Sequence, residues 1–434
     1  MNLEGSIEHF AKLTSDKPAV ITQGQTLSYS VLWERIQERA QQLRDGGLRE
    51  GQPYGFVTTQ DADFIVTYCA VHLCGAVSVP LESLPKTSIP LSRDWEEAAV
   101  RGGAILYTTG TTGDAKGVMI SEKAWTASAE NLIDRLRFTP DLLFIICGPL
   151  NHLGSLSKIY PTLMTGGTLY IMENLKDFRA FFSVFTLPFA KFASFLVPSS
   201  IRMLLQLARK ELVAVSHKVD FIETGAAPIS QNDMEQLCQF LPHSRLYNTY
   251  ASTETGIICS YEFSKYGCQP GIVGTPMQHS SVRIGEDGRV VCSGDTIMSG
   301  YVDSPEATAK VLVGGEVYTS DVGSIDAQGM LHLQGRRVDV INVGGYKVNP
   351  SEVEDAVSAC PLIQDCICVP AKHIVLGTAP KLLYVPKSDQ TVSPKDIAAY
   401  LQGRIENFKI PLFYEAVESI RHTFNGKPDR KAYL

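Results

Sequence analysis

The sequence predicts an α/β protein: a large N-terminal domain of parallel-type sheets flanked by helices, containing a β-rich subdomain, followed by a small α+β C-terminal domain. Through the first 270 residues, apolar segments with helical spacing alternate with short apolar strands, as in parallel sheets covered by helices. The pattern then changes to short strands separated by turns, and after residue 349 to a second mixture of helices and strands.

The elements of the first part follow from apolar periodicity. Residues 30–43 carry apolar side chains three and four positions apart, which predicts a helix. Residues 63–74 form a second apolar helix, which is expected to end at Gly75. We expect strands at 76–81, 142–148, 168–172, 221–224 and 245–247, and helices at 155–164 and within 197–207.

Residues 271–337 are predicted to form the β-rich subdomain, because turn residues such as those at 286–288 separate short apolar runs. Residues 338–434 are predicted to form the separate C-terminal domain, so the N-terminal domain spans 1–337. The expected strands are 282–284, 290–292, 331–333, 365–369 and 381–384, and the expected helices are 351–358 and 394–405.

Composition excludes several classes of protein. The 434 residues are 44% hydrophobic and 20% charged, which argues against a disordered chain, a collagen or a coiled coil. The net charge of −7 argues against general nucleic-acid binding. No signal peptide or membrane-length apolar run is evident, so we expect a cytoplasmic protein. The ten cysteines form no C-x-x-C pair and are expected to be reduced, mostly buried thiols rather than metal ligands.

The strongest local signal is a loop rich in glycine and hydroxyl residues, TTGTTGDAKG at 108–117. Glycines let the backbone approach an anion, and Lys116 adds a positive charge, so the loop suits a polyphosphate. It is not a Walker A loop, because no Ser or Thr follows Lys116 and no glycine directly precedes it. Considered alone, the same letters describe a flexible polar loop equally well.

This loop resembles the phosphate loop of the adenylate-forming enzymes, a superfamily of acyl- and aryl-CoA synthetases, stand-alone adenylation domains and luciferases. Family loops usually carry Ser at the position of Thr109 and Pro at that of Ala115. Further segments resemble family motifs in the family's order along nearly the whole chain, most closely those of the acyl- and aryl-CoA ligases. They are QTLSY at 25–29, GAVSVPL at 75–81, PLNHLG at 149–154, GAAP at 225–228, YNTYASTE at 247–254, YTSDVG at 318–323, GRRVD at 335–339, GGYKV at 344–348 and NGKPDR at 425–430.

The resemblance implies an ATP-dependent acid–thiol ligase that uses Mg²⁺. A carboxylate would attack the α-phosphate of ATP, giving acyl-AMP and pyrophosphate, and the thiol of CoA would then take the acyl group. The first step brings an anion against a polyanion and needs positive charge and oriented donors. The resemblance implies that Lys427 bridges the carboxylate and the α-phosphate and that Glu254 binds Mg²⁺. With His152, these are the implied catalytic residues.

The resemblance also implies a nucleotide site. Tyr250 would offer adenine a flat face, Thr253 would contact the α-phosphate, and Asp321 would accept hydrogen bonds from both ribose hydroxyls. The full set implied for ATP or AMP is Thr108, Thr109, Gly110, Thr111, Thr112, Gly113, Lys116, Gly225, Ala226, Ala227, Asn248, Tyr250, Thr253, Asp321 and Arg336.

An acid pocket is expected around His152, because acyl-CoA ligases carry a histidine there. No acidic residue occurs between Pro149 and Lys158, which argues against an α-amino acid. Lys158 itself is expected to keep its ammonium in water, and the alternative is that it pairs a second carboxylate on the acid. The pocket candidates indicate a small to medium organic or aromatic acid and are Asn151, His152, Gly154, Ser155, Val197, Glu223 and Thr224.

The resemblance implies that the C-terminal domain is mobile and turns between two orientations, one for each step. The hinge would lie at Val338, where the family usually has Asp or Lys, with Asp339 as the fallback. Only residues 85–103 occupy a stretch that is much longer in the family, so we expect a compact but active enzyme. The pantetheine thiol would approach through Gly344, Gly345, Tyr346 and Lys347.

Two alternatives remain open. The acceptor could be the phosphopantetheine of an acyl carrier protein instead of CoA. The chain could also be a non-catalytic protein that binds AMP or acyl-AMP. The presence of the charged residues that the family's chemistry needs argues against this second alternative; they are Lys116, Glu254, Asp321, Arg336 and Lys427.

Overall fold

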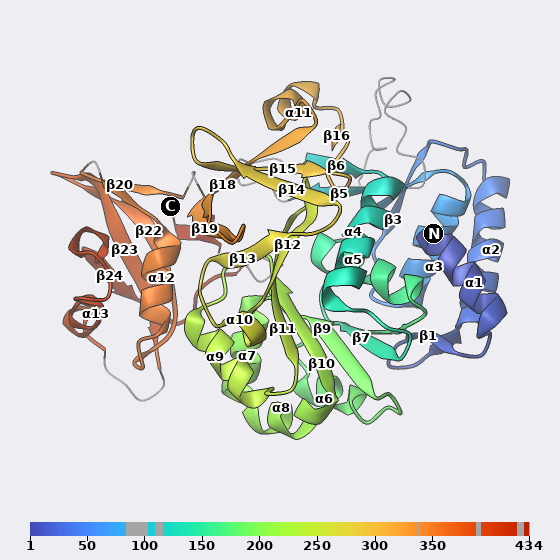
Figure 1. Cartoon of the computed structure of the whole chain (residues 1–434), viewed down its shortest axis with the longest axis horizontal. Coiled ribbons are helices and arrows are strands. Elements are labelled where there is room, and N and C mark those ends of the chain that lie inside the picture. The colour runs from blue at the N-terminus through green and yellow to red at the C-terminus, as the bar shows by residue number, and fades with distance from the viewer. Residues whose placement is uncertain are drawn as a thin grey trace.

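The structure is a computed structural model. It describes residues 1–83, 103–108, 116–336, 339–344, 346–387, 392–422 and 429–433. The stretch at 84–102, most of the glycine-rich loop (109–115) and the expected hinge residue Val338 therefore lie outside the described residues, as do Gly345 and Lys427. N-terminal helices, a central sheet and a C-terminal sheet lie beside one another across the molecule (Figure 1).

The N-terminal helices begin at side chains that cap their first turns. Asn2 accepts the Gly5 N–H at the start of α1 (Leu3–Leu13), and Ser28 accepts the Val31 N–H at the start of α2 (Tyr29–Asp45). The third helix, α3 (Ala62–Leu73), is almost wholly buried, as its apolar sequence predicts. The helices expected at 30–43 and 63–74 are confirmed to within two residues at each end.

A small mixed sheet carries the two ends of the glycine-rich loop. Its strand order is β16-β6-β5-β4-β3. The strands β5 and β6 are antiparallel and pair Thr108 with Lys116, so residues 109–115 connect the two strands of a hairpin. The short strand β16 pairs with β6, although it comes from far along the chain. The bounds are β3 (Pro53–Val57), β4 (Val77–Leu81), β5 (Ala104–Thr108), β6 (Lys116–Ile120) and β16 (Gly300–Tyr301).

The central sheet begins as the mostly parallel sheet that the sequence predicts. Its parallel strands run in the order β11-β10-β9-β7-β8-β1. β7 is buried at every position, as expected for a strand covered on both faces. These elements are β1 (Pro18–Ile21), β2 (Thr26–Ser28), α4 (Glu122–Leu136), β7 (Leu142–Ile146), α5 (Leu153–Met164), β8 (Thr168–Ile171), α6 (Phe178–Val184), β9 (Lys191–Phe195), α7 (Pro198–Leu207), α8 (Arg209–Val215), a 3₁₀ turn (Ser216–Lys218), β10 (Val219–Gly225), α9 (Gln231–Phe240) and β11 (Arg245–Ser252).

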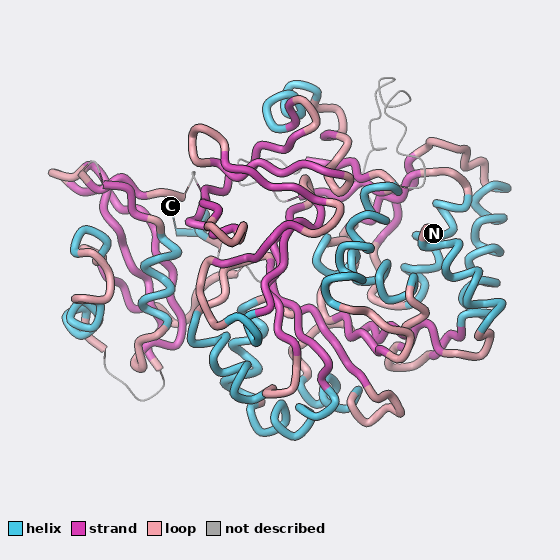
Figure 2. The backbone as a smooth tube through the Cα atoms, in the orientation of Figure 1, coloured by secondary structure: helices cyan, strands magenta, loops and turns pink. Residues whose placement is uncertain are grey.

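The predicted β-rich subdomain continues the same sheet without a break. The order runs β14-β15-β18-β19-β13-β12-β11, and the whole sheet has 14 strands within the described residues. Figure 2 shows strands, in magenta, through the whole middle of the molecule. The elements are β12 (Gly256–Glu262), α10 (Phe263–Tyr266), β13 (Ile272–Pro276), β14 (Ser280–Ile284), β15 (Arg289–Gly294), α11 (Pro305–Val311), β17 (Leu312–Val313), β18 (Glu316–Ile325) and β19 (Leu331–Arg336).

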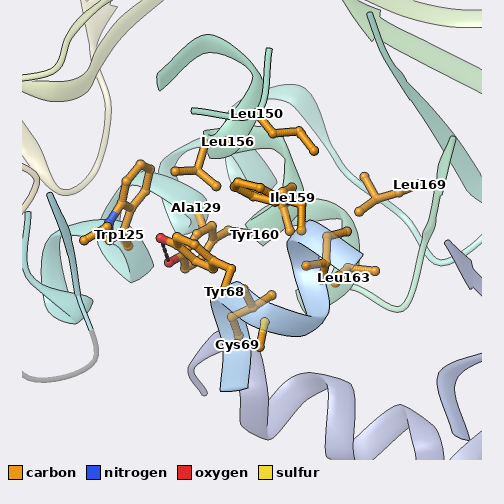
Figure 3. Packing of buried hydrophobic residues seen from close by; sticks show 14 of the residues in the cluster. Tyr68, Cys69, Trp125, Ala129, Leu150, Leu156, Ile159, Tyr160, Leu163 and Leu169 are labelled. Carbon is orange, nitrogen blue, oxygen red and sulfur yellow. Dashed lines mark hydrogen bonds between the residues drawn. The ribbon is translucent and has the colours of Figure 1, made fainter. Parts of the chain in front are cut away.

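The helix α5 is buried on two faces. One face packs Ile159, Tyr160 and Leu163 against α3 and α4, where Trp125 stacks on Tyr160 with ring centroids 5.1 Å apart (Figure 3). The Tyr160 hydroxyl lies 2.9 Å from that of Tyr68. Helical geometry places positions 154 and 158 on the opposite face, which therefore faces the sheet at β9 and β10.

The C-terminal part forms a separate five-stranded sheet in the order β21-β20-β23-β22, with β24 beside β23. The helix expected at 394–405 ends earlier, at Leu401, because Gln402 leaves the helical region at ψ 127° and Gly403 follows at φ +75°. The elements are β20 (Ile341–Val343), β21 (Tyr346–Val348), α12 (Pro350–Ser358), β22 (Ile363–His373), β23 (Gly377–Pro386), α13 (Pro394–Leu401), a 3₁₀ turn (Asn407–Lys409), β24 (Phe413–Ala416) and a final 3₁₀ turn (Arg430–Tyr433).

An ion pair between described residues joins the C-terminal sheet to the helices beside the central sheet. Arg202 on α7 lies 3.2 Å from Asp365 on β22 and 3.1 Å from Asp233 on α9. All ten cysteines are free and six are buried, which confirms the expected mostly buried thiols. None of the helices in the described ranges is long and apolar enough to span a membrane.

Candidate active site

The lysine predicted to bind phosphate and the carboxylate predicted to bind Mg²⁺ meet at Tyr301. Lys116 Nζ lies 5.1 Å from the centroid of the Tyr301 ring, and the Tyr301 hydroxyl donates to Glu254 Oε1 at 3.0 Å. Burial and the Glu254 carboxylate raise the pKa of Tyr301, so its hydroxyl keeps the proton that it donates. Sequence reasoning missed Tyr301, because only the pairing of β16 with β6 brings it here.

Glu254 is presented by a tight turn between β11 and β12 rather than by the start of a helix. The Ser252 N–H donates to Thr255 Oγ1, and the Thr255 N–H donates to Ser252 Oγ, both at 3.1 Å. Gly256 closes the turn at φ +68°, where a Cβ would lie 2.4 Å from the Thr296 carbonyl oxygen. Thr253 and Glu254 are both half-buried in this turn.

The carboxylate predicted to bind ribose is held by the protein at both oxygens. Asp321 and Arg336 are cross-strand partners in β18 and β19, and Arg336 Nε lies 3.3 Å from Asp321 Oδ1. The Tyr250 hydroxyl donates to Asp321 Oδ2 at 2.6 Å. Burial, together with the Asp321 charge, raises the pKa of Tyr250, which is only 7% exposed. Each carboxylate oxygen keeps a further lone pair for a ligand hydroxyl.

The segment predicted to contact adenine leaves β10 through an unusual backbone conformation. A Cβ on Gly225 would lie 2.6 Å from the Thr249 carbonyl oxygen, so a side chain does not fit there. Ala226 has φ +66°, which is uncommon for a residue with a Cβ and marks local strain. Ala226 is exposed and Ala227 is half-buried. Asn248 is buried, and its amide donates to the Ile272 carbonyl at 3.0 Å, which ties β11 to β13.

Four of the predicted acid-pocket residues lie within two positions of the start of α5. His152 is the N-cap residue, and its carbonyl accepts the Leu156 N–H at 2.9 Å. Asn151, His152 and Gly154 are half-buried, whereas Ser155 is buried. A Cβ on Gly154 would come within 2.8 Å of the Phe195 ring. Val197 is the N-cap residue of α7, two positions after Phe195. Sequence reasoning missed Phe195, which reads as an ordinary strand residue.

Lys158 corrects one expectation. It was expected to keep its ammonium in water, and this is wrong, because Lys158 is 1% exposed and donates to the buried Glu223 Oε1 at 2.7 Å. Burial lowers the pKa of Lys158, while the Glu223 carboxylate acts to raise it. Because side chains alternate along a strand, Glu223 and Gly225 share one face of β10. Thr224 therefore lies on the opposite face, where its Oγ1 has no partner among the described residues.

The described residues of the predicted thiol path lie in the C-terminal sheet. Gly344 has φ +56°, and the exposed Tyr346 stacks on Phe408 with ring centroids 4.7 Å apart. Lys347 is exposed. Asp339, the fallback hinge residue, lies 4.0 Å from Arg430.

The residues present fit a magnesium ion that is shared with a nucleotide. Within the described ranges, no three or more His, Cys, Asp or Glu side chains group as a metal site. Mg²⁺ usually keeps several waters and binds one or two carboxylates together with substrate phosphates. Glu254, which contacts Tyr301 together with Lys116, offers such a carboxylate.

Comparison with known proteins identifies the family. The family model described as AMP-binding enzyme matches residues 7–88 and 103–302, and the model described as AMP-binding enzyme C-terminal domain matches residues 352–427. A feruloyl-CoA synthase from Amycolatopsis sp is 25% identical, and the match covers 96% of this chain and 95% of that protein. A 2-succinylbenzoate–CoA ligase from Staphylococcus aureus (strain JH9) is 27% identical over 81% of this chain and 70% of that protein.

Solved structures share the fold. ATP-bound MatB from Rhodopseudomonas palustris superposes with a TM-score of 0.85 at 23% identity, covering 100% of this chain and 99% of the other. The anthranilate CoA ligase AuaEII in complex with anthranoyl-AMP gives a TM-score of 0.86 at 17% identity, covering 100% and 96%. The family models and the two curated relatives confirm the predicted relationship to the adenylate-forming enzymes. The chain belongs to the AMP-binding enzyme family.

Proposed function

We propose that this chain is an ATP-dependent acid–thiol ligase. It activates a small or aromatic carboxylic acid as acyl-AMP, releases pyrophosphate and transfers the acyl group to the thiol of CoA. One observation carries the proposal: Lys116 and Glu254 meet at Tyr301, while Tyr250 and Arg336 hold the Asp321 carboxylate. This arrangement supplies a phosphate contact, a metal ligand and a ribose acceptor from three distant segments of the chain.

In the first step, a carboxylate oxygen of the acid forms a bond to the α-phosphorus of ATP, and the bond from that phosphorus to pyrophosphate breaks. Lys116 and the hairpin loop neutralise charge on the β- and γ-phosphates, and Asp321 fixes the ribose. Glu254 would hold a Mg²⁺ ion, which would supply further neutralisation of the phosphate charge. Lys427 brings its ammonium to the acid and the α-phosphate, which lowers the repulsion between the two anions.

In the second step, the CoA thiolate attacks the carbonyl carbon of the acyl-AMP, and the bond to the phosphate oxygen breaks to release AMP. The relatives support CoA as the acceptor, because feruloyl-CoA synthase and 2-succinylbenzoate–CoA ligase are named for CoA products. Loading of an acyl carrier protein stays a prediction, and replacing CoA with a holo-carrier in the same assay tests it.

ATP–pyrophosphate exchange without CoA tests the proposal, across short aliphatic, dicarboxylic, aryl and amino acids. We expect exchange with one class of acid. Lys427→Ala is expected to slow exchange at least ~100-fold, in line with the loss of one charge-stabilising group, and to spare acyl transfer from supplied acyl-AMP to CoA. Lys12→Ala, an exposed lysine on α1 paired with Glu8, is the matched control.

Two results contradict the proposal. If ATP binds but no acid of the panel supports exchange, the proposal is contradicted for these classes of acid, and two readings are left: a different class of acid, or a nucleotide-binding protein without ligase activity. If Lys427→Ala exchanges as fast as Lys12→Ala, the role given to Lys427 is wrong.

A further inference from the structure

Two cysteines that are distant in the sequence lie in contact near the surface of the N-terminal domain. Cys238 belongs to α9, and Cys268 lies in the loop between α10 and β13. Their Sγ atoms are 3.6 Å apart, although 30 positions separate them in the chain. Both side chains are half-buried, and residues 239, 267, 269 and 270 beside them are exposed. A small reagent in the solvent therefore has access to the pair.

The two sulfurs are held near each other without a covalent bond. The helix α9 fixes the position of Cys238. The loop that carries Cys268 is held by the Tyr261 hydroxyl, which donates to the Gly267 carbonyl at 2.7 Å. Both cysteines also pack against the same apolar cluster, which α9 shares with the strands beside it. The contact is thus part of the folded arrangement of α9 and this loop.

A disulfide at this place needs a small movement. Two bonded sulfurs are about 2.05 Å apart, so the Sγ atoms of Cys238 and Cys268 have to approach each other by roughly 1.5 Å. Each cysteine side chain can rotate about its Cα–Cβ bond, which displaces the sulfur by such a distance. Six of the ten cysteines are buried, which shields their thiols from a reagent in the solvent.

We propose that Cys238 and Cys268 form a reversible disulfide under oxidising conditions, and that they are a redox modification site of this chain. Disulfides of proteins in reducing compartments are usually transient and serve catalysis or redox sensing. The inference is independent of the proposed ligase activity, because it rests on two thiols that the reaction does not use.

The cross-link would act on the segment that carries most of the predicted nucleotide contacts. It would close residues 238–268 into a loop that contains β11, the turn that presents Glu254, and β12. Tyr250 and Asn248 lie on β11 within this loop. A cross-link limits the conformations of the unfolded chain, so the oxidised protein should resist unfolding better than the reduced protein.

The two thiols differ in acidity, which determines the order of the reaction. Burial and the hydrogen bond to Cys268 raise the pKa of Cys238 to about 12. Burial also raises the pKa of Cys268, but the hydrogen bond from Cys238 acts to lower it. Because the thiolate is the nucleophile, Cys268 attacks first. Glu235 on α9 adds a negative charge that raises both pKa values, so an uncharged oxidant is favoured over an anionic one.

The oxidant in this reaction is a small, uncharged disulfide. In the first step, the Cys268 thiolate bonds to one sulfur of the reagent, the S–S bond of the reagent breaks, and one half leaves and takes up a proton. In the second step, Cys238 loses its proton and attacks Cys268 Sγ, and the other half of the reagent leaves and takes up a proton. Overall, the two cysteines lose two electrons and two protons, and the reagent gains them.

The first test treats the whole chain with hydroxyethyl disulfide in the absence of denaturant. The remaining thiols are alkylated, and the protein is digested without reduction for mass spectrometry. We expect a link between the peptides that contain Cys238 and Cys268, with loss of two hydrogens, and its disappearance after treatment with dithiothreitol. The unfolding temperature of the oxidised protein should rise by roughly 3 °C, because the link closes a loop in the unfolded chain.

Single variants separate the link from other effects of the reagent. In Cys238→Ala, the mixed disulfide between Cys268 and the reagent is expected to accumulate, because the second step is blocked. In Cys268→Ala, the mixed disulfide at Cys238 should form more slowly. Neither variant should gain unfolding temperature from the treatment. The matched control is Cys74→Ala, which removes a half-buried cysteine elsewhere and should keep both the link and the rise. Thermal unfolding before treatment checks that each variant folds.

Three results overturn the inference. Mixed disulfides at Cys238 and Cys268 of the unmodified protein, without a link between them, would show that the two sulfurs do not meet. An absence of reaction at both cysteines in the folded protein would show that the reagent has no access to them. A link between two chains instead of within one chain would place the reactive contact elsewhere. The exchange assay tests the proposed function separately, so failure of one leaves the other standing.

Discussion

Replacing Tyr250 with Phe tests whether the Tyr250 hydroxyl orients the Asp321 carboxylate, which is proposed to bind ribose. The change removes one oxygen atom and leaves the ring in its apolar surroundings, beside Ile258 and Val273. It deletes the hydrogen bond from the Tyr250 hydroxyl to Asp321 Oδ2 at 2.6 Å. Asp321 keeps Arg336 at 3.3 Å, so the carboxylate loses one of the two side-chain partners that it has among the described residues.

The size of the effect follows from the charge of the acceptor. Hydrogen bonds to charged groups contribute about 1.5–3 kcal/mol, whereas those between neutral groups contribute about 0.5–1.5 kcal/mol. Because Arg336 remains in place, we take the lower end, about 1.5 kcal/mol, which corresponds to roughly tenfold in affinity. The ribose contact exists before and during the reaction, so the KM for ATP should rise about tenfold with little change in kcat.

Steady-state exchange at varied ATP concentrations measures this change. The matched control is Tyr261→Phe, because the Tyr261 hydroxyl also donates a short hydrogen bond, but to the Gly267 carbonyl at 2.7 Å and not to a predicted nucleotide residue. That control should lose about 1 kcal/mol of stability and keep its KM for ATP. If the two variants show the same KM, the Tyr250 hydroxyl is a structural bond only and the reasoning is refuted.

Three further changes test other parts of the structure. Tyr301→Phe frees Glu254, so half-maximal exchange should need several-fold more Mg²⁺; an unchanged magnesium titration contradicts this. Burial and the nearby Glu354 charge raise the pKa of Asp355 to about 7. The folded state therefore keeps the Asp355 proton at pH values where the unfolded state has already lost it. The contribution of Asp355 to the free energy of unfolding falls as pH rises from about 4 to about 7. The advantage of Asp355→Asn in thermal unfolding should therefore grow over that range; a constant advantage contradicts it. Lys158→Met alone should cost about 3–5 kcal/mol in denaturant unfolding, most of it recovered in Lys158→Met/Glu223→Leu; equal stability of the two contradicts this.

The helices and strands that could be predicted are those defined by the pattern of neighbouring residues. The helix α2 and the strand β7 follow from side chains within each element, because spacing or a continuous apolar run defines which face is buried. The glycine-rich loop at 108–117 could be singled out for the same reason, since its glycines, threonines and lysine are adjacent. The end of α13 was misplaced by four residues, because Gln402 is compatible with a helix and only the turn at Gly403 ends it.

Contacts between distant residues were not predictable from one sequence. Tyr301 lies 47 residues from Glu254, and Lys158 lies 65 residues from Glu223. A lone lysine on a helix is normally solvated, and nothing near Lys158 in the sequence indicates a buried partner. The same applies to β13, which pairs with β12 and also with β19 and so joins the two parts of the central sheet. The sequence pattern changes at residue 271, from apolar helices and strands to short strands separated by turns. The backbone hydrogen bonding of the central sheet nevertheless continues across this position.

The unbroken central sheet has a consequence for how this chain can be divided. A fragment ending near residue 270 would lose β13 and β19, and the outer edge of β12 would then expose unpaired N–H and C=O groups to other chains. A fragment ending after β19 keeps every pair of that sheet, whereas β20 to β24 form their own sheet. The β-rich segment is thus not an autonomous module, and residues 1–336 form the smallest N-terminal fragment that leaves no new edge open to aggregation.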